Sequence, residues 1–204
     1  MRFVVMCLAL AACTPDIASG AYLCGPDSAC PEGQTCNGVK DENAGLEADT
    51  CVLESLARPF ACTPDANSEP DNTMAEARAI PLTQCVSPMF INNSCMLADD
   101  SADWITFVPP SVCTAVAVQV RLTFPVAYEV LAFELWDVNA NMKIGEDTEC
   151  TQGADTGAVR RCLDMTLVPG TQYGVKVTPT GEGGCSGDCA YNRYTLSVQL
   201  ATPG

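Results

Sequence analysis

The segment Val116-Ala-Val-Gln-Val-Arg-Leu-Thr-Phe124 decides the fold of this chain. Its apolar residues occupy every second position, and Val112, which precedes the segment, has the same parity. Gln119, Arg121 and Thr123 take positions between the apolar residues. An alternation of period two indicates a β-strand with one face buried and the other exposed to solvent. The polar residues also argue against a membrane span, so we expect a strand of a soluble sheet.

The same alternation recurs along the C-terminal half of the chain. The apolar positions of the four further segments are Leu131, Phe133 and Leu135; Leu163, Met165 and Leu167; Tyr173, Val175 and Val177; and Tyr194, Leu196, Val198 and Leu200. Turn residues separate these segments, with Asp137–Asn141 and Pro169-Gly170 predicted as turns. Many short alternating strands predict a mainly β fold, an antiparallel β-sandwich of jelly-roll type, which we place at residues 63–204.

The N-terminal segment has the features of an export leader. Arg2 supplies a positive start, residues 3–10 are apolar, and Leu10-Ala11-Ala12-Cys13 ends the run with small residues and a cysteine. The apolar run is shorter than the roughly 20 residues that span a bilayer. This pattern resembles the signal of a bacterial lipoprotein precursor. The alternative is an ordinary secretory leader, with Cys13 a disulfide partner.

The lipoprotein resemblance implies a signal peptide at residues 1–12 and lipids on Cys13, which becomes the first mature residue. Several acyl chains on one residue anchor a protein stably in a membrane. Residues 13–23 then form a tether. Because Thr14 is not the aspartate that retains many lipoproteins in the inner membrane, the resemblance favours the cell envelope's outer membrane, on a face that the sequence does not specify.

The composition excludes several functions. The chain has 204 residues with 25 acidic and 10 basic side chains, a net charge of −15, and no histidine. Such acidity excludes nucleic acid as a partner; it is explained either by solubility or by binding of divalent cations. The lack of histidine removes the usual general base of serine and cysteine hydrolases and the common ligand of catalytic zinc. Chemistry based on carboxylate pairs, as in glycoside hydrolases, remains open.

Twelve cysteines remain after Cys7 in the leader and Cys13 are set aside, and in an exported chain they predict six disulfides. They are Cys24, Cys30, Cys36, Cys51, Cys62, Cys85, Cys95, Cys113, Cys150, Cys162, Cys185 and Cys189. Wide spacings and the lack of histidine argue against zinc. Loops of hairpin size suggest the pairs Cys85–Cys95 and Cys150–Cys162, and a tight turn suggests Cys185–Cys189. Cys62 and Cys113 would then pair with each other.

Residues 24–62 are rich in turn residues and too short to fold without cross-links. Their spacing resembles C-x5-C-P-x-G-x2-C modules near the front of predicted lipoproteins of predatory and social soil bacteria. That resemblance implies the pairs Cys24–Cys36 and Cys30–Cys51. The module is either a disulfide-pinned spacer or, as a rival function, a protease inhibitor.

The stretch after Cys62 contains turn residues throughout Thr63–Thr73 and predicts a hinge, and therefore a domain boundary near residue 62. Met74–Ile80 could form one helical turn before Pro81 ends it.

Five blocks of sequence, in order along residues 69–198, resemble the bacterial pre-peptidase C-terminal domain. The blocks are Glu69-Pro-Asp-Asn-Thr73 with Ala75 and Ala77, Asp103-Trp-Ile-Thr-Phe-Val108, Leu135-Trp-Asp-Val-Asn-Ala-Asn141, Val168-Pro-Gly-Thr-Gln-Tyr-Gly-Val-Lys-Val177 and Tyr194-Thr-Leu-Ser-Val198. The resemblance implies a non-catalytic β-sandwich, of a kind usually appended to secreted proteases and related to the collagen-binding domains of clostridial collagenases.

The resemblance also implies a calcium site. The matching oxygen donors here are Glu69, Asp71, Asn72 and Asp103, with Asp99 and Asp100 nearby. Calcium takes 6 to 8 oxygen ligands, which two converging loops can supply. The usual order of the first block is Glu-Pro-Asn-Asp, whereas in this chain Asp71 precedes Asn72. The alternative is that these residues only cap turns.

The expected function is a non-catalytic, lipid-anchored envelope protein that presents its sandwich to another protein or a glycan, for adhesion or scaffolding. The rivals are an accessory domain of a secreted hydrolase, a glycoside hydrolase using Asp99, Asp100 and Asp103, and the protease inhibitor already named. The aromatic residues that could stack on sugars are Trp104, Trp136, Tyr173, Tyr191 and Tyr194. Four of them lie within the alternating strands, which favours the core instead.

Overall fold

A computed structural model describes residues 17–60, 70–96, 101–152, 154–181 and 192–203. The leader with Cys13, the residues Glu69, Asp99, Asp100 and Tyr191, and the cysteines Cys62, Cys185 and Cys189 lie outside the described residues. Within those ranges no helix has the length and apolarity needed to cross a bilayer.

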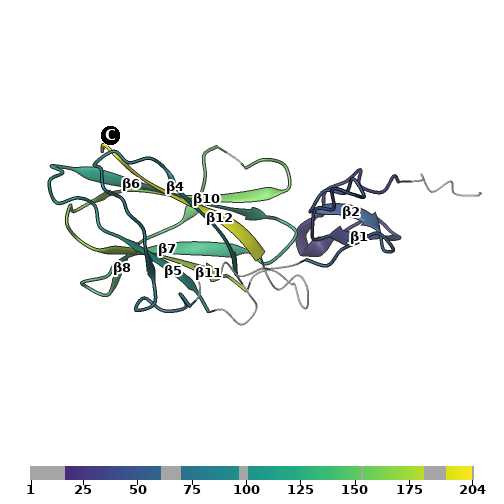
Figure 1. The fold of residues 1–204 in the computed structure, drawn as a ribbon, viewed down its shortest axis with the longest axis horizontal. Coiled ribbons are helices and arrows are strands. Elements are labelled where there is room, and N and C mark those ends of the chain that lie inside the picture. The colour runs from purple at the N-terminus through teal and green to yellow at the C-terminus, as the bar shows by residue number, and fades with distance from the viewer. Residues whose placement is uncertain (1–16, 61–69, 97–100, 153, 182–191, 204) are drawn as a thin grey trace, which may run out of the picture.

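Two five-stranded sheets face each other and form the body of the protein (Figure 1). The first sheet has the order β4-β12-β6-β10-β9, with bounds β4 Phe90–Met96, β12 Asn192–Ala201, β6 Val116–Pro125, β10 Ala158–Leu167 and β9 Thr148–Glu149. The second has the order β3-β5-β11-β7-β8, with bounds β3 Arg78–Ala79, β5 Asp103–Phe107, β11 Tyr173–Pro179, β7 Leu131–Asp137 and β8 Met142–Glu146. All pairings are antiparallel except β3 with β5. The predicted antiparallel β-sandwich is therefore confirmed.

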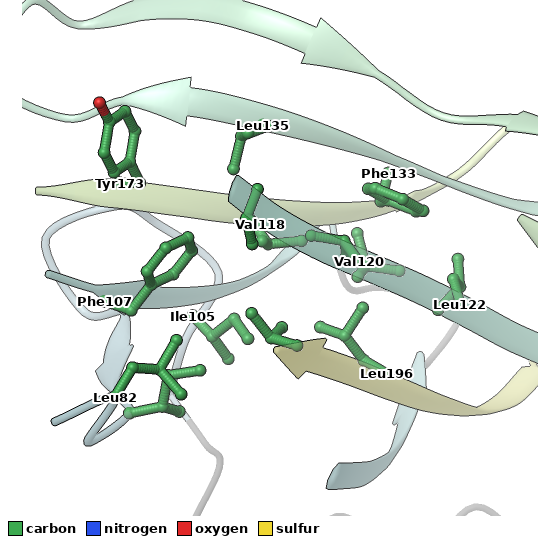
Figure 2. Close-up of a cluster of buried hydrophobic side chains, with 14 of the residues drawn as sticks. Leu82, Ile105, Phe107, Val118, Val120, Leu122, Phe133, Leu135, Tyr173 and Leu196 are labelled. Atoms are coloured by element: carbon green, nitrogen blue, oxygen red, sulfur yellow. The ribbon is translucent and has the colours of Figure 1, made fainter. Parts of the chain in front are cut away.

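The core lies between the two sheets, as the alternation predicts. Along β6 every second residue from Val116 to Phe124 is buried, and β12 repeats this pattern from Asn192 to Leu200. Figure 2 shows Val118, Val120 and Leu196 of the first sheet pointing toward side chains of the second. Removal of this apolar surface from water is the main force that holds the sheets together.

The burial of the core departs from the sequence prediction at three positions. Val112 continues the apolar row in sequence, but it lies in the loop before β6 and is 84% exposed. Leu163 and Met165 of β10 are only half-buried. Their neighbour in the opposite sheet is Gly145 of β8, which has no side chain to cover them.

The turns that join the strands follow their sequence signatures. The Asp137 carboxylate accepts a hydrogen bond from the Ala140 N–H (2.9 Å), and Asn141 has a positive φ of 48°, which closes the β7–β8 hairpin. Gly170 has φ +80° and its N–H donates to the Pro109 carbonyl (2.8 Å). Pro169-Gly170 is therefore a turn, as predicted.

The segment Met74–Ile80 is not a helix. The Glu76 N–H donates to the Thr73 carbonyl (3.0 Å) in a turn, after which the chain extends into β3. Ile80 N–H then donates to the Thr106 carbonyl (2.8 Å) of β5. Pairing with an existing strand satisfies the backbone here better than one isolated helical turn can.

The small module consists of a 3-10 turn, η1 (Pro26–Ser28), and a two-stranded sheet of β1 (Gln34–Asn37) and β2 (Thr50–Leu53). Its disulfides are Cys24–Cys36 and Cys30–Cys51, with Cα separations of 5.7 and 5.6 Å. These are the two pairings that the resemblance to small cysteine-rich modules implies. In so short a segment they replace most of a hydrophobic core.

Two disulfides of the sandwich join described residues, and one of them was predicted while the other corrects the prediction. Cys150 pairs with Cys162 as expected, but Cys85 pairs with Cys113, with a Cα separation of 5.6 Å. The proposed pairs Cys85–Cys95 and Cys62–Cys113 are therefore wrong; Cys95 is disulfide-bonded elsewhere. Cys95 lies within β4 and pairs with Arg193 of β12, whereas Ser87, close to Cys85 in the chain, donates its N–H to the Leu200 carbonyl of the same strand. Because a strand rises about 3.3 Å per residue, the two cysteines lie toward opposite ends of β12.

Candidate functional site

The small module packs on the sandwich through the turn that follows β6. Ala127 and Tyr128 of this turn are buried against Cys24 and Cys51 of the module. The backbone N–H and the hydroxyl of Ser28 both donate to the Ala127 carbonyl, at 2.8 and 3.0 Å. The module and the sandwich are therefore joined by noncovalent contacts as well as by the chain.

Arg193, on the outer face of β12, is the main polar link between the two parts. Its guanidinium forms an ion pair with Asp49 and donates to the Gly38 carbonyl (3.1 Å), both in the module. The same group lies over the rings of Phe60 and Tyr128, 5.4 and 5.6 Å from their centroids. Planar guanidinium groups suit such combined ionic and aromatic contacts. We call these five residues the clasp.

The clasp is closely packed. Burial raises the pKa of the Tyr128 hydroxyl well above its ordinary value, and the Asp49 charge adds to the effect, so Tyr128 stays neutral. The rings of Phe60 and Tyr128 lie 4.4 Å apart. At Gly38 a Cβ atom would collide with the backbone of Phe60, so only glycine allows this approach.

A groove of about 610 Å³ opens beside the clasp, on the outer face of the first sheet. Leu23 and Ala48 of the module form one wall and the loop at Gly157 forms another. Its floor includes Thr195, whose hydroxyl donates to the Asn93 side-chain oxygen (2.7 Å). The volume lies within the range of about 300 to 1,000 Å³ of ligand pockets.

The chemistry of the groove suits a ligand with neutral hydrogen-bonding groups. Hydroxyl and amide groups of Asn93, Thr123 and Thr195 line it, together with the exposed side of Leu23. The aromatic residues that line it, Phe124 and Tyr194, are buried and offer no ring face. Sugar hydroxyls or a peptide backbone match these donors and acceptors.

Two of the predicted calcium ligands meet at the start of β5. Asp71 and Asp103 are both 3% exposed, and the Asp71 carbonyl accepts a hydrogen bond from the N–H of Trp104 (2.9 Å). The Tyr194 hydroxyl donates to the Asp103 carboxylate (2.5 Å). Burial, followed by the negative charge of Asp103, raises the pKa of Tyr194 well above its ordinary value.

The donor set fits a hard cation in its chemistry. Asn72 lies beside Asp71, and its side-chain oxygen is buried with no hydrogen-bond donor in the described part of the chain. Such an oxygen is costly to bury unless a donor or a cation meets it. Asp71, Asn72 and Asp103 would hold the ion, while Glu69 lies outside the described residues. Calcium there would cross-link the loop before β3 to β5.

A thiolate metal site has no support in the described ranges. There, the one group of three potential ligands comprises Cys24, Cys30 and Cys51. All three are disulfide-bonded, so they offer no thiolate to a metal.

The aromatic residues are mostly buried. Trp104, Tyr173 and Tyr194 are buried, whereas Trp136 is half-buried. Trp136 meets Trp104 edge to face at 5.8 Å and donates its ring N–H to Glu134 (2.9 Å). These partners account for the rings without a sugar.

The clasp was missed from the sequence because its partners are far apart in the chain: Arg193 and Asp49 are 144 residues apart. One signal was present. Arg193 is the single charged residue between Asp188 and Gly204, on the outward face of an alternating strand. An isolated arginine in an otherwise uncharged strand of an acidic protein is a candidate for a specific ion pair.

Comparisons with known proteins return few matches. No protein-family model matches the chain, and no curated protein matches it. Among solved structures, it is similar to the pre-peptidase C-terminal domain of collagenase from Bacillus anthracis, with 16% identity and a TM-score of 0.41. The match covers 60% of this chain and 93% of that domain. That domain is of the family which residues 69–198 resemble in sequence.

Proposed function

We propose that this protein is a non-catalytic, lipid-anchored component of a bacterial cell envelope, which binds a protein or glycan partner in the groove beside the clasp. The observation that carries this proposal is that the groove is built jointly by the module and the sandwich. A module that served only as a spacer would not have to contribute residues to a groove on the sandwich. Cys13 supplies the anchor, in the outer membrane.

The rival enzymatic function has weaker support. A glycoside hydrolase needs two carboxyl groups that flank an accessible glycosidic bond. Asp103, the one member of the proposed acidic group that the structure describes, is buried and hydrogen-bonded to Tyr194. A substrate has no direct access to such a carboxylate, which suits a structural role better.

A pull-down from envelope fractions tests partner binding. The wild-type protein is the bait, beside Thr195→Arg, which fills the groove, and Thr166→Arg, which places the same side chain at an exposed position of β10. We expect the wild type and Thr166→Arg to recover the same partner, identified by mass spectrometry, and Thr195→Arg to lose it. Recovery of no specific partner, or equal recovery by all three baits, would contradict the proposal.

The anchor is tested separately by mass. The membrane-extracted protein should be heavier than the chain starting at residue 13 by diacylglycerol and one further acyl chain, and Cys13→Ala should lose this mass. Equal masses after removal of the leader would contradict lipidation.

We also propose that Ca²⁺ binds at Asp71, Asn72 and Asp103. The buried oxygen of Asn72 is the specific observation in favour of it. Calcium should raise the thermal unfolding midpoint of the wild type, because a ligand that binds only the folded state stabilises it. Asn72→Ala should weaken this response, whereas Asn93→Ala, away from the loop, should retain it. Identical midpoints in calcium and in chelator would refute the site.

A further inference from the structure

One end of the sandwich carries almost no charge, although the protein as a whole is strongly acidic. The described residues in four stretches, 79–96, 104–120, 165–175 and 194–203, contain no Asp, Glu, Lys or Arg. The stretches are separated in sequence by charged segments. The four stretches therefore form one uncharged surface only if the fold brings them together.

The fold does bring them together. Val116 of β6 pairs with Leu167 of β10, and its neighbour Ala117 pairs with Ala201 of β12. In the other sheet Phe107 of β5 pairs with Tyr173 of β11. All four stretches thus reach the end of the sandwich opposite the small module, which Figure 1 shows at the other end of the molecule. We call this the uncharged end.

Exposed apolar side chains gather at the same end. Of the eleven large hydrophobic residues that are exposed in the described part of the chain, six lie in these four stretches, between 47% and 84% exposed. They are Val86, Met89, Ile91, Val108, Val112 and Val168. Single exposed apolar residues are ordinary, but a concentrated group marks an interaction surface.

The loops that carry these residues are tied to one another. The disulfide Cys85–Cys113 holds Val86 next to Val112, because each valine directly adjoins one of its cysteines. The Gly170 N–H donates to the Pro109 carbonyl (2.8 Å), which joins the loop of Val168 to that of Val112. The apolar group is therefore held in place before any partner arrives, which lowers the entropy cost of binding.

Strand β4 continues the uncharged end along one edge of the first sheet. Its sequence, Phe90-Ile-Asn-Asn-Ser-Cys-Met96, has no charged residue, whereas each of the three other edge strands carries at least one: Arg78 in β3, Lys143 and Glu146 in β8, and Glu149 in β9. Natural proteins place charges on edge strands to prevent pairing with another chain. The Arg78 guanidinium, which donates to Asn92 (2.8 Å), marks the border of this surface.

We propose that the uncharged end, with β4 at its side, is the surface through which two copies of this chain associate. Two copies with a net charge of −15 each repel one another. They approach closely without bringing like charges together only where charges are missing. Apolar contact with charges excluded from its centre is also the composition of homodimer interfaces.

A bilayer is the less suitable occupant of the same surface. Segments that insert at a membrane surface combine apolar groups with Trp or Phe and with Lys or Arg near the headgroups. The exposed apolar group here contains valine, methionine and isoleucine, and its four stretches carry no basic residue.

Sedimentation velocity tests this proposal on the exported full chain, with its disulfides formed, over a concentration series in dilute non-ionic detergent. The variants Val112→Glu and Val168→Glu each place a charge at the uncharged end. The matched control is Leu53→Glu, at an exposed apolar position of β2 in the module, at the opposite end of the molecule. Unchanged thermal unfolding midpoints verify that the variants fold.

We expect a dimer of the wild type and of Leu53→Glu, and a rise of about tenfold or more in the dimer dissociation constant for each valine variant. The dissociation constant of the wild type should fall as NaCl rises from about 0.1 to 1 M. Salt shortens the Debye length from about 10 to 3 Å and so screens the repulsion between copies. An interface of ion pairs would respond in the opposite direction.

Three results would overturn the proposal. The first is a wild type that stays monomeric at about 100 μM in high salt, a concentration at which even weak dimers assemble. The second is a dimer that Leu53→Glu weakens as much as Val112→Glu does. The third is a monomer whose Cys13→Ala form, which lacks the proposed lipid anchor, floats with phosphatidylcholine vesicles and loses this binding when Val112→Glu is added, which would assign the surface to a bilayer.

Discussion

Removal of the Arg193 side chain should weaken the whole clasp, because its guanidinium contacts all four other members. Arg193→Ala loses the ion pair with Asp49, the hydrogen bond to Gly38 and the contacts with the rings of Phe60 and Tyr128. The side chains of Arg193 and Asp49 are 33% and 23% exposed, so solvent screens the ion pair only in part.

The magnitude follows from these contacts. A partly screened ion pair contributes up to about 1 kcal/mol, a hydrogen bond from a charged donor about 1.5 kcal/mol, and the ring contacts about 0.5 to 1 kcal/mol. We therefore expect Arg193→Ala to lower the free energy of unfolding by about 3 kcal/mol. Arg193→Lys keeps the positive charge but not the planar guanidinium with its several N–H donors, and should lower the free energy of unfolding by about half as much.

Urea unfolding with intact disulfides measures this loss. The control is Arg121→Ala in the neighbouring strand β6, where the arginine pairs with Asp164 (2.8 Å) and donates to the carbonyls of Val120 and Leu163 (2.9 and 3.2 Å) but has no partner in the module. We expect this control to lose about 2 to 4 kcal/mol, while the module stays as well protected from hydrogen exchange, relative to the sandwich, as in the wild type. A double-mutant cycle with Asp49→Ala isolates the ion pair.

Two outcomes would refute the reasoning about the clasp. If Arg193→Ala lowers the free energy of unfolding by less than about 1 kcal/mol, the contacts with the module add little to stability. If hydrogen exchange in the module is the same in Arg193→Ala and in the wild type, the clasp does not hold the module on the sandwich.

Three further changes test the core and the buried acids. Leu122→Ala, at a fully buried position between the sheets, should cost about 2 to 5 kcal/mol in urea unfolding, whereas an effect below about 1 kcal/mol would mean that the core is not packed there. Burial raises the pKa of Asp147 above its ordinary value, so the folded state loses stability as the pH rises and this carboxyl group ionises. Asp147→Asn should therefore be more stable than the wild type at pH 7 but not at about pH 3. An equal difference in stability at the two pH values would contradict the raised pKa of Asp147. Tyr194→Phe removes the hydroxyl that donates to buried Asp103 and should lower the free energy of unfolding by about 1 to 3 kcal/mol. Because the pKa of Tyr194 is raised, the wild type should also lose stability above about pH 10, and Tyr194→Phe should lose less. Unfolding midpoints measured over a pH series check this difference.

The strands could be predicted because their signal is local. Successive side chains of a strand point to opposite faces, so the alternation at Val116–Phe124 reports burial directly. The turn at Pro169-Gly170 has the same local character, since Gly170 itself takes the positive φ. Prediction failed at Val112, because the apolar alternation extends beyond the point where the strand begins.

The candidate sites were predictable only in part. The resemblance in sequence points to Asp71, Asn72 and Asp103 together, and the structure does place Asp71 and Asp103 near the same tyrosine, Tyr194. Nothing in the sequence indicates the groove, because its walls come from the module and from the loop at Gly157. Spacing alone also misassigned Cys85, since the length of a loop does not say which strand ends meet.

The sequence by itself determined the class of fold, the disulfide-rich character of the chain and its acidity, because alternation, composition and cysteine content need no knowledge of distant contacts. Tertiary structure decided the pair Cys85–Cys113, the contact of Arg193 with Asp49 and the uncharged end. Each of these depends on which strands become neighbours. That choice is made by the burial of the two sheets against each other, which acts over the whole chain at once.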